Sequence, residues 1–184
     1  MSDPTFAQPE RRSYLVPILL ALVAIGVAVV IARQYFPATT INIAHVRTDL
    51  LPTTTVYRSE STVVGVNQTQ IVLFIATTLR LENQMRLPIF LDNFLLTFIT
   101  PDGQLQAKAL TKDELANAQL SFPALKPLTT NPLLRDATID PGKSAEGTVV
   151  FSLPIPKSMW DARKIATIEV DVYHQHPVYQ DIPK

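Results

Sequence analysis

Residues 69 to 82 read TQIVLFIATTLRLE, and this stretch decides the fold class. Apolar side chains take alternate positions on one face: Ile71, Leu73, Ile75, Leu79 and Leu81. Polar side chains take much of the other face: Gln70, Thr78, Arg80 and Glu82. Successive side chains of a β-strand point to opposite faces, so this two-residue period predicts a strand that is buried on one side.

The other predicted strands either share this alternation or are rich in β-branched residues. The clearer ones cover residues 94–100, 104–110, 148–153 and 165–173. Shorter and weaker ones cover residues 41–46, 54–57 and 62–66. Pro101-Asp102-Gly103 separates the predicted strands 94–100 and 104–110. It predicts a hairpin, because these residue types favour the dihedral angles of turns. We therefore expect seven or eight strands.

Helical signals are few in this part of the chain. Thr111 and Glu114 are spaced as in a capping box, which predicts a short helix over about residues 112–119. One more helical turn is expected at residues 157–162. The segment 121–132 contains three prolines and cannot donate a continuous ladder of hydrogen bonds, so we expect an extended connection over the surface.

This pattern of elements predicts a mainly β fold for residues 41–184. Many short alternating strands with almost no helix are typical of two antiparallel sheets packed face to face, in an immunoglobulin-like β-sandwich with one short helix. A parallel α/β sheet is excluded because it needs helices between its strands.

The chain before this domain contains a long uncharged stretch. Residues 13–32 read SYLVPILLALVAIGVAVVIA, and twenty residues at about 1.5 Å each span the hydrocarbon layer of a bilayer. The sequence predicts a cytoplasmic tail at 1–12, a transmembrane helix at 13–33 and a linker at 34–40. We expect the helix to contact lipid at positions along its whole length, including Tyr14, Leu20, Gly26 and Ile31.

A cleaved signal peptide is the alternative, with a cut after Ala32. The apolar stretch exceeds the usual length of a signal h-region, about 7 to 15 residues, which favours an uncleaved anchor. Arg11 and Arg12 precede the stretch and only Arg33 closely follows it, which favours an extracytoplasmic position for the domain. Alanines at 24, 28 and 32 share one helical face and permit helix pairing, but they do not by themselves indicate a homodimer.

Two stretches resemble known families. Residues 77–105, TTLRLENQMRLPIFLDNFLLTFITPDGQL, resemble the water-stress (WHy) and late-embryogenesis-abundant β-sandwich domains, with Asn83 as the polar residue that ends a strand. Residues 139–154, IDPGKSAEGTVVFSLP, resemble immunoglobulin-fold or telokin-like domains of unknown function, which bacterial envelope proteins carry behind an N-terminal anchor. The resemblance implies a sandwich in a bacterial envelope, and it carries over no catalytic or binding residue.

Motifs for chemistry are scarce. The chain has no cysteine, which excludes disulfides and thiolate metal sites. Its five glycines form no phosphate-binding loop motif. Sixteen basic residues balance sixteen acidic ones, which disfavours nucleic-acid binding. His174 and His176 lie two apart at a strand end before Pro177, where both can face the same side, and are the one candidate pair of metal ligands. No catalytic residue and no cofactor are predicted.

The leading functional hypothesis is a non-catalytic envelope protein. One helix anchors it, in a bacterial inner membrane with the domain facing the periplasm, and the sandwich binds or scaffolds a protein partner. Leu125 and Leu128, in the expected surface segment, are the predicted partner contacts. The alternative is a ligand- or metal-handling domain that uses His174 and His176 or a pocket between the sheets.

Overall fold

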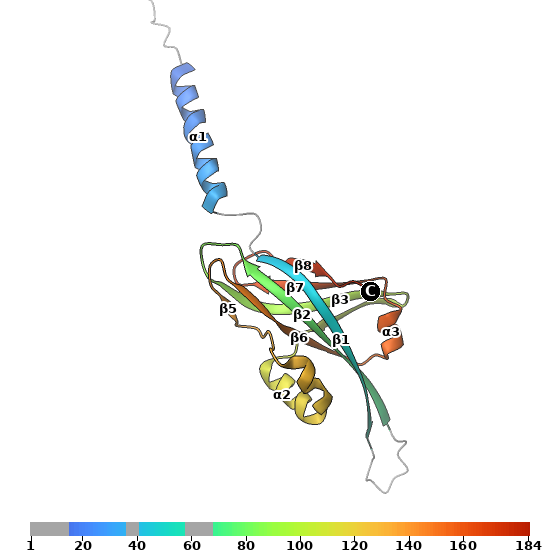
Figure 1. Ribbon diagram of the computed structural model, residues 1–184. Coiled ribbons are helices and arrows are strands. Elements are labelled where there is room, and N and C mark those ends of the chain that lie inside the picture. Colours follow the sequence, from blue (N-terminus) through green and yellow to red (C-terminus); the bar gives the residue numbers. More distant parts are fainter. Residues whose placement is uncertain (1–14, 36–40, 58–67) are drawn as a thin grey trace, which may run out of the picture. The chain divides into compact units, whose positions relative to one another are not determined.

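The computed structural model describes residues 15–35, 41–57 and 68–184 (Figure 1). The chain divides into two compact units, Met1–Ala38 and Thr39–Lys184.

In the first unit the described residues form one helix, α1 (Leu15–Tyr35). The window Leu15–Ala32 is long and apolar enough to cross a membrane, and its side chains are exposed within this unit. Of the predicted lipid contacts, Leu20, Gly26 and Ile31 lie on this helix, whereas Tyr14 lies outside the described residues. A membrane anchor and a signal sequence both have these properties.

The second unit consists mainly of two antiparallel sheets. One sheet has three strands in the order β1 (Ile41–Tyr57), β2 (Gln68–Asn83) and β6 (Ser144–Leu153). The other has the order β4 (Gly103–Lys108), β3 (Ile89–Thr100), β7 (Ile165–Val172) and β8 (Val178–Asp181), and the two-residue strand β5 (Thr138–Ile139) also pairs with β3. These described residues therefore contain eight strands, which confirms a mainly β domain of the β-sandwich type.

The main core lies between the sheets and confirms the face assignment of β2 for four of its five apolar residues, whereas Ile71 is 43% exposed and Thr78 of the polar face is buried. Its buried residues from β2 are Leu73, Ile75, Leu79 and Leu81. They pack with buried residues of the other strands, among them Phe94, Leu96, Phe98, Phe151, Ile168 and Val170. Both faces of β2 are buried near Phe74 and Ala76, which belong to a second, smaller core. Alternate side chains of the apolar run VLFIA in β2 therefore pack into two different cores, one on each face of the strand.

The second core is covered by two helices. α2 (Lys112–Ser121) contributes Leu115, and the 3-10 helix η1 (Pro123–Thr129) contributes Leu125. The predicted capping box at the start of α2 is confirmed: the Thr111 backbone N–H donates to Glu114 Oε2 at 2.8 Å, and Glu114 N–H donates to Thr111 Oγ1 at 3.3 Å. The predicted helical turn near residue 160 is also confirmed, as α3 (Lys157–Asp161).

The expectation of an extended segment at 121–132 is wrong over η1. Proline fixes φ near −65°, a value that a 3-10 turn shares with extended structure, so the three prolines alone do not exclude a helix. The contacts around Leu125 favour the 3-10 helix over an extended segment, because the Leu125 side chain is buried in the second core. Thr129 Oγ1 donates to the Leu125 carbonyl at 2.8 Å and closes the last turn.

Three other elements differ from expectation. The two predicted pieces at 41–46 and 54–57 are parts of one strand, β1, which runs through Pro52. Proline is compatible with an edge strand such as β1, because alternate N–H groups of an edge strand point away from the sheet and take no part in the ladder. Strands β5 and β8 were not predicted. The predicted strand at 62–66 lies outside the described residues and stays a prediction.

The two lateral sides of the sandwich differ. On the side of β6 the sheets are joined: Leu110 N–H donates to the Val150 carbonyl at 2.8 Å. Farther along β6, Thr148 N–H donates to the Asn131 carbonyl at 2.8 Å, so another segment covers that edge. Gly147 permits this close approach, because a Cβ there would lie 2.9 Å from the Leu133 Cβ. Edge strand β1 pairs only with β2 in the described part of the chain.

Candidate functional site

The structure corrects the predicted partner contacts. Leu125 is fully buried in the second core, so its side chain offers no surface to another chain. Leu128 is half-buried and packs against the same core. The prediction is wrong for Leu125, because an apolar residue between prolines was assigned to an extended surface segment, whereas η1 places its side chain in the second core. For Leu128, which keeps part of its surface, it stays a prediction.

The histidine pair also lies differently from expectation. β7 ends at Val172, and His174 and His176 follow in the connection to β8 rather than on a strand. Gln175 N–H donates to the Val172 carbonyl at 3.1 Å, which closes a turn. His174 has φ 58°, so the alternation that would place both imidazoles on one face does not continue through it. Among the described residues no group of three His, Cys, Asp or Glu side chains is placed to hold a metal ion.

His174 instead lies in a hollow of about 480 Å³ at one end of the five-stranded sheet. The hollow is lined by Phe90, Asp136, Tyr173 and His174. We call these four residues the aromatic hollow. β3 carries Phe90 near its start, and Tyr173 directly follows β7. The strand pairing holds them together, because Tyr173 N–H donates to the Phe90 carbonyl at 3.0 Å.

The backbone of the aromatic hollow has a second unusual property. Asp136 has φ 66° and His174 has φ 58°, and these are the two non-glycine residues with positive φ in the described ranges. Asp136 is held by its backbone N–H, which donates to the Leu91 carbonyl at 2.8 Å beside a register shift in β3. Aspartate and histidine tolerate this conformation better than most residues, but it still costs free energy relative to glycine. Both such residues therefore meet at one surface feature.

The chemistry of the hollow is that of a contact surface. Phe90 and Tyr173 remain 47% and 44% exposed although both are large and apolar. The rings of Tyr173 and His174 lie with centroids 6.4 Å apart. Asp136 is exposed, and its Oδ2 lies 4.0 Å from Arg135 Nε. Exposed aromatic rings with a few polar groups at the rim suit the binding of an apolar or aromatic side chain.

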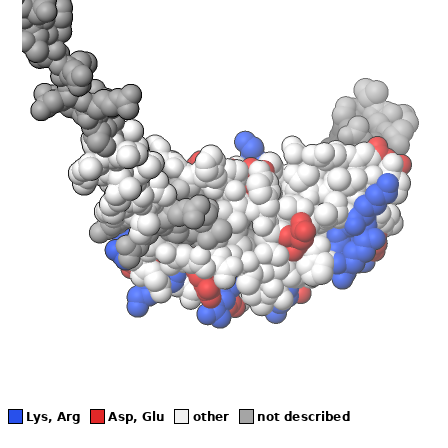
Figure 2. All heavy atoms as spheres, turned by 90° about the horizontal axis from the view of Figure 1, so that it is seen from above, with Lys and Arg blue, Asp and Glu red and all other residues white. Residues whose placement is uncertain are grey.

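Charge is sparse on the face of the domain that Figure 2 shows. In the view of Figure 2 uncharged side chains dominate, and the largest group of Lys and Arg lies toward the right-hand end. The ion pairs found in the described residues are exposed ones, such as Arg80 with Glu82 at 3.4 Å. Pairs of this kind contribute little to stability.

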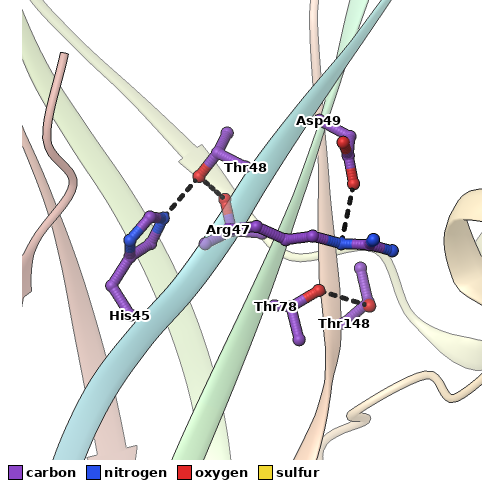
Figure 3. A network of polar contacts seen from close by, with 7 residues as sticks. His45, Arg47, Thr48, Asp49, Thr78 and Thr148 are labelled. Atoms are coloured by element: carbon purple, nitrogen blue, oxygen red, sulfur yellow. Dashed lines mark hydrogen bonds and ion pairs between the residues drawn. The ribbon is translucent and has the colours of Figure 1, made fainter.

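A network of polar contacts surrounds the irregularity in β1 (Figure 3). The register with β2 shifts between His45 and Arg47, and the side chains of these two residues lie on opposite sides of β1. On one side His45 Nε2 lies 2.9 Å from Thr48 Oγ1, which lies 3.2 Å from Thr77 Oγ1. These hydrogen bonds satisfy polar groups on the inner side of the sheet, next to the irregularity in β1.

Comparison with known proteins identifies no family for this chain. No protein-family model matches it, and no curated protein matches it. The predicted resemblance to WHy, late-embryogenesis-abundant or telokin-like domains therefore remains unconfirmed.

Several solved structures are similar at low identity. One is an uncharacterized β-sandwich protein from Clostridium difficile 630, with 11% identity, a TM-score of 0.39, and coverage of 80% of this chain and 89% of that one. Another is the structural genomics target SoR45, with 10% identity, a TM-score of 0.30, and coverage of 74% and 82%. A third is an ApaA protein from Bordetella pertussis, with 12% identity, a TM-score of 0.30, and coverage of 80% and 93%. The fold described above therefore rests on the strand pairing and core of this chain itself.

The sequence contained part of the signal for the aromatic hollow. Tyr173 falls on the outward face of the predicted strand at 165–173, and an outward aromatic residue is a recognisable exception to the polar pattern. Phe90 and Asp136 were not predicted, because they are distant in sequence from Tyr173 and only the pairing of β3 with β7 brings Phe90 to it.

Proposed function

We propose that this chain is a non-catalytic, membrane-anchored protein whose β-sandwich binds a protein partner through the aromatic hollow. In this proposal α1 remains uncleaved as a single-pass anchor, and the domain adopts an immunoglobulin-like arrangement on the extracytoplasmic side. A bacterial inner membrane with the domain in the periplasm is the setting that the resemblance implies.

The observation that carries the proposal is the coincidence of exposure and backbone strain at one place. Large apolar side chains that stay exposed mark interaction surfaces when they are grouped. Strained backbone conformations persist where the surrounding structure enforces them, and they cluster at functional sites. Phe90 and Tyr173 are the exposed large side chains, and Asp136 and His174 are the residues with strained backbone. A partner side chain in the hollow would remove both rings from water.

The hollow lies at the end of the domain where β1 begins. Ile41 pairs with Asn83, and Asn83 Nδ2 donates to the carbonyl of Ile139, which pairs with Ile89 next to Phe90.

Site-specific photocrosslinking in intact membranes tests this proposal. A benzophenone side chain is introduced at Phe90 or Tyr173, and at Tyr179 as the matched control. Tyr179 is an exposed tyrosine on β8 of the same sheet, outside the hollow. We expect the same discrete adduct from positions 90 and 173 and none from position 179. Equal adducts from all three positions, or none from 90 and 173, would contradict a partner contact in the hollow.

Metal titration separates this proposal from the metal-handling alternative. Zinc or copper added to the purified protein should leave the imidazole NMR signals of His174 and His176 without stoichiometric shifts. Stoichiometric shifts of both signals, lost in the double alanine variant, would favour the alternative.

A further inference from the structure

Strand β1 has the longest free edge in the described part of the sandwich. It runs for 17 residues and pairs with β2 alone, and outside that ladder its backbone takes part in no hydrogen bond among the described residues. The other edges are covered or short: Asn131 bonds to β6, the chain after β4 bridges to β6 at Ala109, and β8 has four residues. The edge of β1 therefore offers unpaired N–H and C=O groups to another strand.

The second half of this edge continues past the rest of the sandwich (Figure 1). Up to Leu50 the strand has neighbours, because Leu50 lines a hollow with Lys184. β2 pairs with β6 only as far as residue 73, so residues 53–57 and 68–72 form a two-stranded ribbon. A two-stranded ribbon is only marginally stable in water, so pairing with a further strand would stabilise it. We call residues 51–57 the free segment.

The free segment lacks the charges that usually protect an edge strand. It reads LPTTTVY, and the residues of β2 that pair with it read QTQIVLF, so neither strand carries a charge here. Proteins commonly protect a free edge with charged side chains or with proline, and Pro52 is the only such residue in the free segment. Its β-branched residues favour a strand. The free segment is therefore suited to pair with another uncharged strand.

We propose that the free segment pairs in antiparallel fashion with the free segment of a second copy of this chain. A two-fold axis normal to the sheet relates two such strands, and it would join two three-stranded sheets into one sheet of six strands. Pairing over the whole free segment places Thr54, its central residue, opposite Thr54 of the second copy. Since β1 runs outward in each copy, the two sandwiches lie at opposite ends of the joint.

Self-complementarity is the reason for choosing a second copy as the partner. A two-fold axis brings each residue of the free segment opposite a residue of the same segment, so only uncharged side chains meet, and threonine pairs across strands are favourable. The nearest charged side chain of β1, Asp49, is already paired, with its Oδ2 3.1 Å from Arg47 Nε. This inference does not rest on the function proposed above.

Disulfide trapping tests the pairing, because the chain has no cysteine of its own. One cysteine replaces Thr54, or Thr138 as the matched control, since Thr138 is an exposed threonine on β5 of the other sheet. Opposed residues of an antiparallel pair have Cα atoms about 4.5–5.5 Å apart, a distance that a disulfide spans. Oxidation of the full-length protein in intact membranes should give at least about tenfold more covalent dimer from Thr54→Cys than from Thr138→Cys. Equal yields would overturn the proposal, and so would an adduct of Thr54→Cys with a different protein in place of the dimer.

Charge substitutions give a second measurement, by sedimentation of the full-length protein in uncharged detergent. Thr54→Lys sets like charges opposite each other across the two-fold axis and should weaken dimerisation by about fivefold or more. Thr54→Glu should do the same, whereas Thr138→Lys should leave dimerisation unchanged. Differently tagged Thr54→Lys and Thr54→Glu copies should co-purify when mixed, because opposite charges then meet, and this recovery also shows that both variants fold. An unchanged dimer in Thr54→Lys, or no recovery in the mixture, would overturn the proposal.

Discussion

Replacing Phe151 by alanine should remove a large part of the stability of the domain. Phe151 lies on β6 opposite Ile75 of β2, and its side chain is fully buried in the main core. An aromatic side chain buries about 150–250 Å², which at about 25 cal/mol per Å² corresponds to roughly 4–6 kcal/mol. Partial relaxation around the cavity reduces the measured loss, so we expect the free energy of unfolding to fall by about 3–5 kcal/mol.

Phe90→Ala is the matched control for this prediction. The same residue type is removed from the neighbouring sheet, but Phe90 is 47% exposed and lines an open hollow. About half of the area is involved, which corresponds to roughly 2–3 kcal/mol at most, and no closed cavity adds to it, so we expect a clearly smaller loss than for Phe151→Ala. The two variants thus separate a phenylalanine that stabilises the fold from one that is available for contact. Phe90→Ala should instead weaken partner capture in the crosslinking experiment.

Urea unfolding of the compact unit Thr39–Lys184, followed by Trp160 emission and far-UV circular dichroism, measures both changes. The slope m should stay constant, so that the shift in midpoint reports stability alone. A loss below about 1 kcal/mol for Phe151→Ala would refute the assignment of this side chain to the core. A loss for Phe90→Ala equal to that for Phe151→Ala would refute the interpretation of the hollow as a free contact surface.

The remaining predictions concern the anchor, the topology and the capping box. The protein should stay in the membrane fraction through carbonate washing at its full length, and a soluble product that starts at Arg33 would indicate signal cleavage instead. An alkaline phosphatase fusion after Lys184 should be active, and an inactive fusion in intact cells would reverse the orientation. Thr111→Ala should cost about 1 kcal/mol in urea unfolding. Bonds from the Thr111 backbone and hydroxyl lower the pKa of Glu114 below its ordinary 4.5, so this contribution is present above pH 4.5 and is lost as the pH falls through the lowered pKa. Glu114→Gln should remove that pH dependence, and a pH dependence of stability identical to that of the unaltered protein would contradict it.

Local sequence patterns predicted most of the regular structure. The alternation in β2, the turn between β3 and β4, and the capping box of α2 each depend on residues within a few positions of one another. Such patterns act through nearest-neighbour geometry, which one sequence contains completely. The same reasoning identified the apolar stretch of α1.

The candidate site could be predicted only in small part. His174 was singled out for metal binding, yet its positive φ takes it off the strand and into the aromatic hollow. Leu125 was singled out for partner contact, yet η1 buries it. In both cases the residue was singled out for its chemistry. Where its side chain points depends on a backbone turn, and that turn is stabilised by contacts with other parts of the fold.

The sequence by itself determined that this chain has an apolar N-terminal helix and a mainly β domain without cysteine chemistry. Only the tertiary structure decided that β1 continues through Pro52 as an edge strand, and that Phe90 meets Tyr173. It also decided that Arg163 is buried with its Nη2 donating to the Pro183 carbonyl. The physical reason is range: periodicity and capping are local, whereas edges, hollows and buried charges arise from pairings between residues tens of positions apart.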